Sequence, residues 1–217
     1  AYFNIVAQSS ESTVVTEYKP QTKRSEAYQS ETELEREFIR LLQELGYEYL
    51  PIHKVKDLVD NLRLQLEAVN GYRFSDGEWG RFFSEVLANP KSGIVEKTRL
   101  IQEDFVQVLR RDDGSSKNIT LFDKKNIHNN RLQVINQYAV SKEEGAAHDN
   151  RYDVTVLVNG LPMVHIELKR RGVPIREAFN QIDRYQRDSF WAASGLFEYV
   201  QIFVVSNGTN TKYYSNT

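Results

Sequence analysis

The sequence predicts an α/β fold in which a mixed β-sheet is flanked by helices, with extra helices near the N-terminus. In the first part of the chain, apolar residues recur at helical spacing. From residue 98 onward, runs of strand length follow one another, and one helical pattern then separates them from a last pair of strands. This order of elements is typical of a sheet covered by helices.

Length and composition limit the kind of protein. A chain of 217 residues is expected to form a single domain with a substantial core. The absence of cysteine excludes disulfides, zinc–thiolate sites and cysteine nucleophiles. The sequence has no N-terminal apolar segment and no run of membrane-spanning length, so we expect a cytoplasmic protein without a membrane partner. It starts at Ala1 and ends soon after an expected strand, which suggests a fragment of a longer chain.

The first 97 residues are expected to be mainly helical after an N-terminal arm. Residues 1–30 hold two short β-prone runs, which could be strands or an arm that docks elsewhere. Residues 31–47 give the clearest helix, because Ser30 and Glu33 form a capping-box pattern and Gly46 supplies a stop. Two more helices, expected to pack outside the sheet, cover residues 54–69 and 76–87.

The remaining part, residues 98–217, is expected to form the sheet core. Strands are predicted over residues 105–109, 118–122 and 132–140. Asp112, Asp113 and Gly114 between the first two have the composition of a hairpin turn, so both acids are interpreted as turn formers instead of metal ligands. Strands are also expected at residues 199–205 and, on the sheet edge, 212–214.

Residues 150–169 contain two apolar runs of strand length, and each run has an acidic residue at a position where a strand normally has an apolar one. Because strand side chains alternate, His165, Glu167 and Lys169 share one face of the second apolar run. Asp153 stands near the start of the first run, so the neighbouring strand could deliver a second carboxylate. Two carboxylates beside a lysine suit a hard divalent cation such as Mg²⁺. For His165 a hydrogen-bonding or packing role is expected.

The turn between these two runs decides whether the carboxylates can meet. A plain two-residue turn at Asn159 and Gly160 would place Asp153 and Glu167 on opposite faces of the sheet. A three-residue loop with Gly160 or a neighbour at positive φ, or a one-residue bulge near Pro162, would place them opposite each other. We therefore predict one of these two irregularities.

A helix is expected after Pro174, with Gln181 and Tyr185 on one face. From Lys169 to Arg187 the sequence has six cations and two anions, although the whole chain has a net charge of −2. Such a strip beside an acidic site fits a phosphodiester substrate, whereas a plain solvated helix face would explain the same charges. Gln181 and Tyr185 could likewise be no more than part of an amphipathic helix.

Together, the pattern D(x13)ExK and the downstream QxxxY resemble the PD-(D/E)xK nucleases. The segment RYDVTVLVNGLPMVHIELK followed by QxxxY is similar to the N-terminal nuclease domain of the R (restriction, motor) subunit of type I restriction enzymes. LEREFIRLLQELGY, NNRLQVINQYAV and VVSNG agree, and the resemblance spans roughly residues 31 to 214. Tyr152 stands where the family usually has a proline before the aspartate.

The resemblance implies a PD-(D/E)xK restriction-endonuclease-like core and Mg²⁺-dependent cleavage of double-stranded DNA, with Mn²⁺ as a substitute. It also implies roles for particular side chains. The metal ligands would be Asp153, Glu167 and the carbonyl of Leu168. Lys169 would act on the attacking water, and Glu35 would contact the metal's water shell. Gln181 and Tyr185 would lie near DNA or the catalytic groups. Glu35 could equally be a solvated helix glutamate.

The resemblance also implies partners. The working enzyme would be a bacterial or archaeal cytoplasmic complex in which ATP-driven motor domains outside this chain move DNA and other subunits recognise and methylate it. The sequence has no GxxxxGK[ST] pattern, so ATP would bind only to those motor domains. Two alternatives stay open: a stand-alone RecB-like exonuclease or junction resolvase, and a non-catalytic nuclease fold that binds DNA or a partner.

Overall fold

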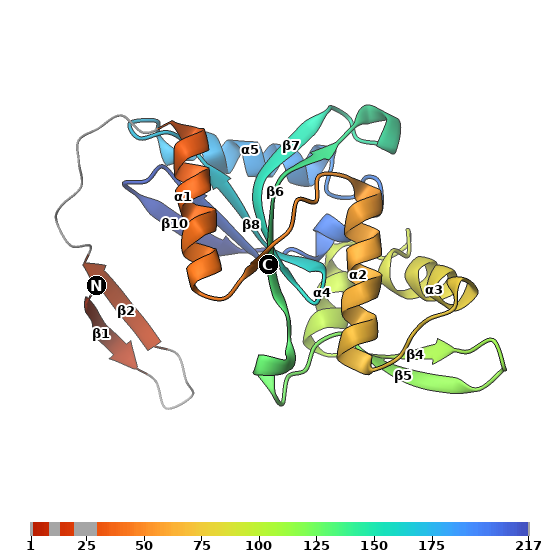
Figure 1. The fold of residues 1–217 in the computed structure, drawn as a ribbon. Helices are drawn as coiled ribbons and strands as arrows, with labels where there is room; N and C mark the ends of the chain where they lie inside the picture. The colour runs from red at the N-terminus through yellow and green to blue at the C-terminus, as the bar shows by residue number, and fades with distance from the viewer. Residues whose placement is uncertain (1, 9–13, 20–29, 217) are drawn as a thin grey trace.

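A computed structural model of the chain describes residues 2–8, 14–19 and 30–216. Its centre is a six-stranded mixed sheet in the order β10-β9-β8-β7-β6-β3 (Figure 1). The strands are β3 (Glu48–Tyr49), β6 (Leu132–Val140), β7 (Asn150–Val158), β8 (Leu161–Leu168), β9 (Ile202–Ser206) and β10 (Thr211–Ser215). Strands β6, β7 and β8 are antiparallel, whereas β3 runs parallel to β6 and β9 runs parallel to β8. The predicted mixed α/β fold is confirmed.

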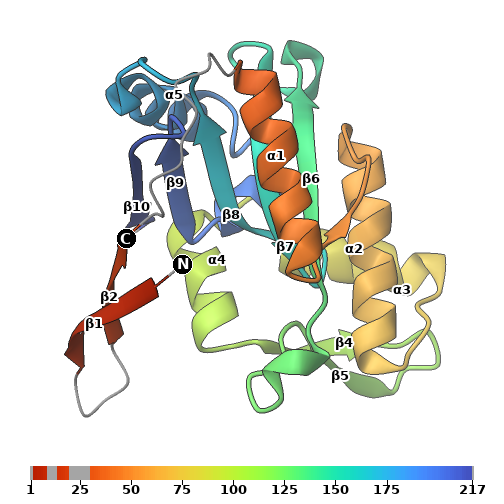
Figure 2. The same ribbon diagram turned by 60° about the vertical axis from the view of Figure 1, so that its left-hand side comes forward.

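Helices cover the sheet, and they are α1 (Glu31–Glu44), α2 (Val55–Asn70), α3 (Asp76–Phe82), α4 (Ile94–Gln102) and α5 (Ile175–Asp188). Helix α3 continues into a π-helical turn, η1 (Phe83–Leu87). Helix α1 lies along β6, β7 and β8 (Figure 2), where Ile39 packs with Val154 and Ile166. A larger apolar cluster joins side chains of α2 to α5 with Leu157 and Phe203 from the sheet.

The sequence signals at both ends of α1 are confirmed. The Ser30 side chain accepts a hydrogen bond from Glu33 N, and the Glu33 carboxylate accepts one from Ser30 N. Gly46 has a φ of 93°, which glycine adopts without steric cost, and the helix ends just before it at Glu44. The predicted helices over residues 54–69 and 76–87 correspond to α2 and to α3 with η1.

The sequence prediction was wrong where strands were expected to begin at residue 98. Helix α4 occupies residues 94–102, and the first strand of this region starts at Val106. Ile94, Val95 and Thr98 are β-branched and favour strands in isolation. Tertiary contacts override that preference, since the buried Lys97 ammonium donates to the Gly195 carbonyl at 2.9 Å and pairs with Glu198 at 2.5 Å.

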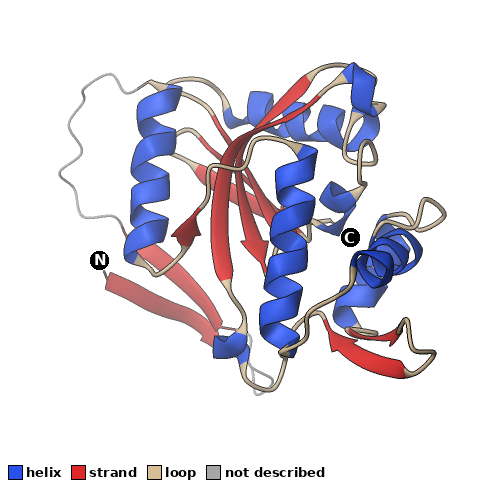
Figure 3. Cartoon of the chain, turned by 45° about the vertical axis from the view of Figure 1, so that its right-hand side comes forward, coloured by secondary structure: helices blue, strands red, loops and turns tan. Residues whose placement is uncertain are grey.

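Two small hairpins lie outside the main sheet. Strands β4 (Val106–Arg110) and β5 (Ser116–Thr120) form a separate antiparallel pair (Figure 3). The Asp113 carboxylate in their turn accepts from Ser115 N at 2.9 Å, which confirms the predicted turn-forming role. At the N-terminus, β1 (Tyr2–Gln8) and β2 (Val14–Lys19) pair with each other, so the β-prone runs there do form strands.

The hairpin of β7 and β8 contains a one-residue bulge. Its turn residues, Asn159 and Gly160, have φ of 51° and 84°. Near the turn Leu157 pairs with Pro162, but the next pairs are Val156 with Val164 and Val154 with Ile166, so Met163 is the extra residue. Continuing this shifted register places Asp153 opposite Glu167. The predicted bulge near Pro162 is confirmed.

The turn is held from two sides. The buried Asn159 side chain donates to the Leu121 carbonyl at 2.9 Å and accepts from Arg131 N at 2.8 Å. On the other side, a Cβ at Gly160 would lie 2.7 Å from the Cα of Leu62 in α2. Only glycine therefore permits this approach of the hairpin to the helix. No helix among the described residues is both long and apolar enough to cross a bilayer.

Replacing Gly160 with alanine should lower the free energy of unfolding by roughly 3 kcal/mol, which combines a left-handed backbone penalty with overpacking against α2. Urea denaturation measures this change. Gly114→Ala is the matched control, because Gly114 has nearly the same φ of 83° but a Cβ there would meet nothing within 4 Å. That variant should lose only about 1 kcal/mol. Equal losses in both variants would show that the contact with Leu62 is unimportant.

Candidate active site

Neighbouring strands bring two carboxyl groups together at one end of the sheet. Glu167 on β8 is 0% exposed, and Asp153 on β7 is partly buried. Leu168 N donates to Asp153 Oδ2 at 2.9 Å, which ties the aspartate to the partner strand. The two carboxyl groups lie close enough for each to affect the pKa of the other. The predicted meeting of these two acids is present in the structure.

Burial raises the pKa of both acids far above their ordinary values. The pKa of Asp153 rises to about 7, first because of burial and then because of the neighbouring Glu167 carboxylate. The pKa of Glu167 also rises to about 7 through burial, against the attraction of the Lys169 ammonium. Two carboxyl groups in such contact share a proton until a cation replaces it.

Lys169 completes this acidic group. Its Nζ lies 3.3 Å from Glu167 Oε1, and its side chain is 13% exposed. The Lys169 backbone N donates to the Ser206 carbonyl of β9 at 2.8 Å, which fixes the chain just beyond the end of β8. An ammonium held in this way offers a positive charge at the rim of the buried acid pair.

His165 lies on the same strand face as Glu167 and is 0% exposed. Its ring contacts those of Tyr152, Tyr185 and Phe190 at centroid distances of 5.5, 6.0 and 5.8 Å. Burial lowers the pKa of His165 to about 4. Its Nε2 lies 3.4 Å from Glu167 Oε2, yet neither ring nitrogen meets hydrogen-bond geometry with any described group. Of the two expected roles, the structure shows packing.

Helix α5 places Gln181 and Tyr185 beside the acid pair. Gln181 Nε2 donates to the Tyr185 hydroxyl, and that hydroxyl donates to the Arg151 carbonyl of β7 at 2.9 Å. Tyr185 is 1% exposed, and burial together with the Glu167 carboxylate raises its pKa. The phenol therefore holds the strand that carries Asp153 and is not accessible to DNA from solution.

Two glutamates of α1 have different surroundings. Glu35, expected at the water shell of a metal, has its carboxylate occupied by the side-chain amides of Asn136 and Gln137. Glu31, in the first turn of α1, accepts from Arg170 N at 3.2 Å. Its charge also raises the pKa of Glu167. Glu31 therefore contacts the segment that follows β8 and acts electrostatically on Glu167.

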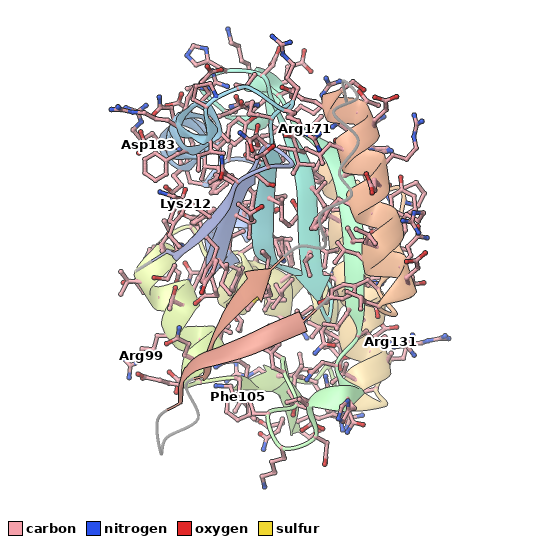
Figure 4. The ribbon with its side chains drawn as sticks, turned by 90° about the vertical axis from the view of Figure 1, so that its left-hand side faces the viewer. Arg99, Phe105, Arg131, Arg171, Asp183 and Lys212 are labelled. Atoms are coloured by element: carbon pink, nitrogen blue, oxygen red, sulfur yellow. The ribbon has the colours of Figure 1, made fainter. Side chains whose placement is uncertain are left out.

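The predicted basic strip continues from β8 onto α5. Arg170, Arg176, Arg184 and Arg187 are exposed, and Arg187 also lies 3.6 Å from Asp183. Figure 4 shows Arg171 and Asp183 at one end of the molecule and Arg131 and Phe105 at the other. The exposed cations therefore lie just after the end of β8 and along α5.

The residues at the acid pair fit a magnesium ion. In the part of the chain that the structure describes, no group of three or more His, Cys, Asp and Glu side chains could hold a metal. Mg²⁺ does not require such a group, because it commonly binds through one or two carboxylates and keeps water and substrate phosphate as its other ligands. Glu167 Oε2 is buried without a hydrogen-bond partner among the described groups, so it is available as a ligand.

The chain is similar in sequence to type I restriction enzyme subunits. The family described as "Type I restriction enzyme R protein N terminus" matches residues 28–217. The chain is 49% identical over 213 residues to the type I restriction enzyme EcoprrI endonuclease subunit of Escherichia coli, covering 98% of this chain and 67% of that protein.

More distant relatives are longer. The type I restriction enzyme SauMSSORF170P endonuclease subunit of Staphylococcus aureus (strain MSSA476) is 42% identical over 195 residues, which cover 88% of this chain and 20% of that protein. The type I restriction enzyme HindI endonuclease subunit of Haemophilus influenzae is 27% identical over 201 residues, with coverage of 82% and 18%. This chain thus spans about a fifth of the length of these two relatives.

The raised pKa values predict a pH dependence of stability. The unfolded chain loses the protons of Asp153 and Glu167 near pH 4, whereas the metal-free folded protein keeps them until about pH 7. The folded state therefore binds more protons in this window, and the pair's contribution to stability is present below pH 4 and lost as the pH rises through 7.

Urea denaturation without divalent cations between pH 4 and 8 tests this. Asp153→Asn removes one ionisable partner, so its unfolding free energy should fall less steeply across the window than that of the wild type. Parallel curves for the two proteins would contradict the assignment of a coupled acid pair.

Proposed function

This chain belongs to the family of N-terminal regions of type I restriction enzyme R proteins, and from that premise we propose that it is the Mg²⁺-dependent endonuclease domain of such a subunit. It would hydrolyse phosphodiester bonds of double-stranded DNA. Cleavage would follow ATP-driven translocation by motor domains outside this chain. The relatives' names as type I endonuclease subunits support this reaction class.

One observation carries the proposal. A bulge places Asp153 and Glu167 opposite each other, and Lys169 Nζ lies 3.3 Å from the Glu167 carboxylate. A structural role for such a group is costly, because two buried carboxylates with raised pKa values destabilise the fold once they ionise. Buried acids of this kind beside a lysine are typical of catalytic sites.

Asp153, Glu167 and the Leu168 carbonyl would hold the metal. A bound Mg²⁺ supplies Lewis-acid neutralisation of the phosphate charge and lowers the pKa of water. Lys169 would orient the attacking water through its ammonium and offset negative charge that grows on the phosphate oxygens. Its position at the rim, with 13% of the side chain exposed, allows contact with a substrate from solution.

Gln181 and Tyr185, the other predicted site residues on α5, would act on the acid pair indirectly, through the backbone of β7. Tyr185 holds the Arg151 carbonyl, two residues before Asp153, and Gln181 orients the Tyr185 hydroxyl. Their role would therefore be to position β7. The exposed arginines of α5 would contact DNA phosphates.

The proposed partners are the methylation and specificity subunits of a restriction–modification complex. A net charge of −2 gives the chain little general attraction for DNA. Delivery of DNA by motor domains would remove the need for strong binding by this domain. Cleavage of bare linear DNA by the isolated chain would instead favour a stand-alone exonuclease or resolvase.

Mg²⁺ should stabilise the folded chain above pH 7. Binding only to the folded state adds roughly 2.7 kcal/mol at a Mg²⁺ concentration one hundred times its Kd. Differential scanning calorimetry should show a higher melting temperature for the wild type and no shift for Asp153→Ala. Asp183→Ala, at an exposed position on α5, is the control and should keep the full shift. A wild-type shift retained by Asp153→Ala would show that the ion binds elsewhere.

Lys169→Ala should reduce DNA cleavage by the assembled full-length enzyme by about 100-fold or more, because it removes charge stabilisation at the reacting phosphate. ATP hydrolysis and translocation should persist, since both would reside in the motor domains. Lys212→Ala, at an exposed position on β10, should retain cleavage. If Lys169→Ala also lost ATP hydrolysis, the variant would be affecting assembly or coupling instead of the cleavage step.

A further inference from the structure

Strand β6 contains a residue in an uncommon backbone conformation. Gln137 has a φ of 51°, in the left-handed region that residues other than glycine rarely adopt. It lies in the middle of a nine-residue strand. A conformation of this kind costs free energy and persists only where surrounding contacts enforce it.

Gln137 lies directly across from Asp153. The paired residues on either side are Asn136 with Val154 and Tyr138 with Tyr152, which leaves Gln137 and Asp153 opposite each other. At this point β7 also departs from regular alternation. Tyr152 belongs to the larger apolar cluster, whereas Val154, two residues later, packs with α1 on the other face. In a regular strand these two side chains would share a face.

Glu35 supplies contacts that enforce the conformation. Its Oε1 accepts from Asn136 Nδ2 at 2.7 Å, and its Oε2 accepts from Gln137 Nε2. The glutamate is only 9% exposed. Asn136 is fixed further, since its Oδ1 accepts from the Tyr49 hydroxyl at 2.9 Å. The Glu35 carboxylate thus binds the side chains of two consecutive residues, Asn136 and Gln137, and so restrains the backbone between them.

We infer that Glu35 is a positioning residue, which holds Gln137 in its left-handed conformation and thereby sets the place of Asp153 opposite Glu167. The inference rests on the proposed function, since it concerns the same acid pair. It differs from a role at the water shell of the metal, because both carboxylate oxygens already accept hydrogen bonds from β6. Glu35 acts through the backbone of two adjacent strands.

Glycine at position 137 separates these two roles. Glycine adopts positive φ about as readily as negative φ, so Gln137→Gly removes the steric cost of the left-handed conformation and with it the need for the contact with Glu35. If Glu35 only enforces the conformation, its removal should matter little in a chain that carries Gln137→Gly. If Glu35 contacts the metal's water shell, its removal should cost the same in either background.

The experiment is a double-mutant cycle in the assembled full-length enzyme. Glu35→Ala should slow DNA cleavage on the order of 10- to 100-fold, as expected for a misplaced catalytic group. In the Gln137→Gly background, the same change should cost less than roughly threefold, because the backbone no longer depends on the carboxylate. Glu44→Ala, at an exposed position of α1, is the control and should leave cleavage unchanged.

A second readout does not depend on cleavage. The Mg²⁺ concentration that gives half of the maximal thermal shift should rise in Glu35→Ala and return toward the wild-type value when Gln137→Gly is added. If Glu35→Ala does not fold, Glu35→Gln replaces it in the same cycle, since the amide keeps the volume but puts an NH2 donor in place of one of the two acceptor oxygens.

The outcomes are distinct. An equal cost of removing Glu35 in both backgrounds, or no cost in either, would overturn the positioning role. Absence of DNA cleavage by the wild-type enzyme, or full cleavage by Asp153→Ala, would instead overturn the proposed function and would say nothing against the contact between Glu35 and Gln137.

Discussion

The candidate site depends on a register constraint in the β7–β8 hairpin. Because strand side chains alternate, a shift of one residue moves every side chain to the other face of the sheet. The extra residue, Met163, provides that shift, and without it Asp153 and Glu167 would lie on opposite faces. The turn itself is fixed by hydrogen bonds of Asn159 and by the close approach of Gly160 to Leu62. Packing against α2 is thus coupled to the geometry of the acid pair.

The same geometry makes the metal-free site unfavourable when ionised. Burial raises the pKa values of Asp153 and Glu167 to about 7, and the nearby Lys169 ammonium offsets only part of that effect. Aromatic rings pack around His165, whose Nε2 lies 3.4 Å from Glu167 Oε2. A cation would relieve the repulsion between the acids, so the fold favours metal binding most strongly once the shared proton has left.

Local sequence signals predicted much of this arrangement. The capping box of Ser30 and Glu33 marked the start of α1, and the requirement that two carboxylates meet predicted the bulge. Helix α4 was missed because its β-branched residues favour a strand, while the buried pair of Lys97 and Glu198 comes from segments far apart in the chain. The left-handed Gln137 had no sequence signal, because glutamine does not indicate positive φ.

The contacts of Glu35 show why residue type alone assigns a role poorly. An acid on the first helix can reach a metal's water, but this carboxylate uses both oxygens to bind the amides of Asn136 and Gln137. Glu31, one turn earlier, holds Arg170 N and acts electrostatically on Glu167. Helix α1 therefore supports both strands that carry the acids. Glu35 binds β6, which pairs with β7, and Glu31 binds the backbone just after the end of β8. Such support on rigid elements is what a site needs to keep its groups in productive geometry.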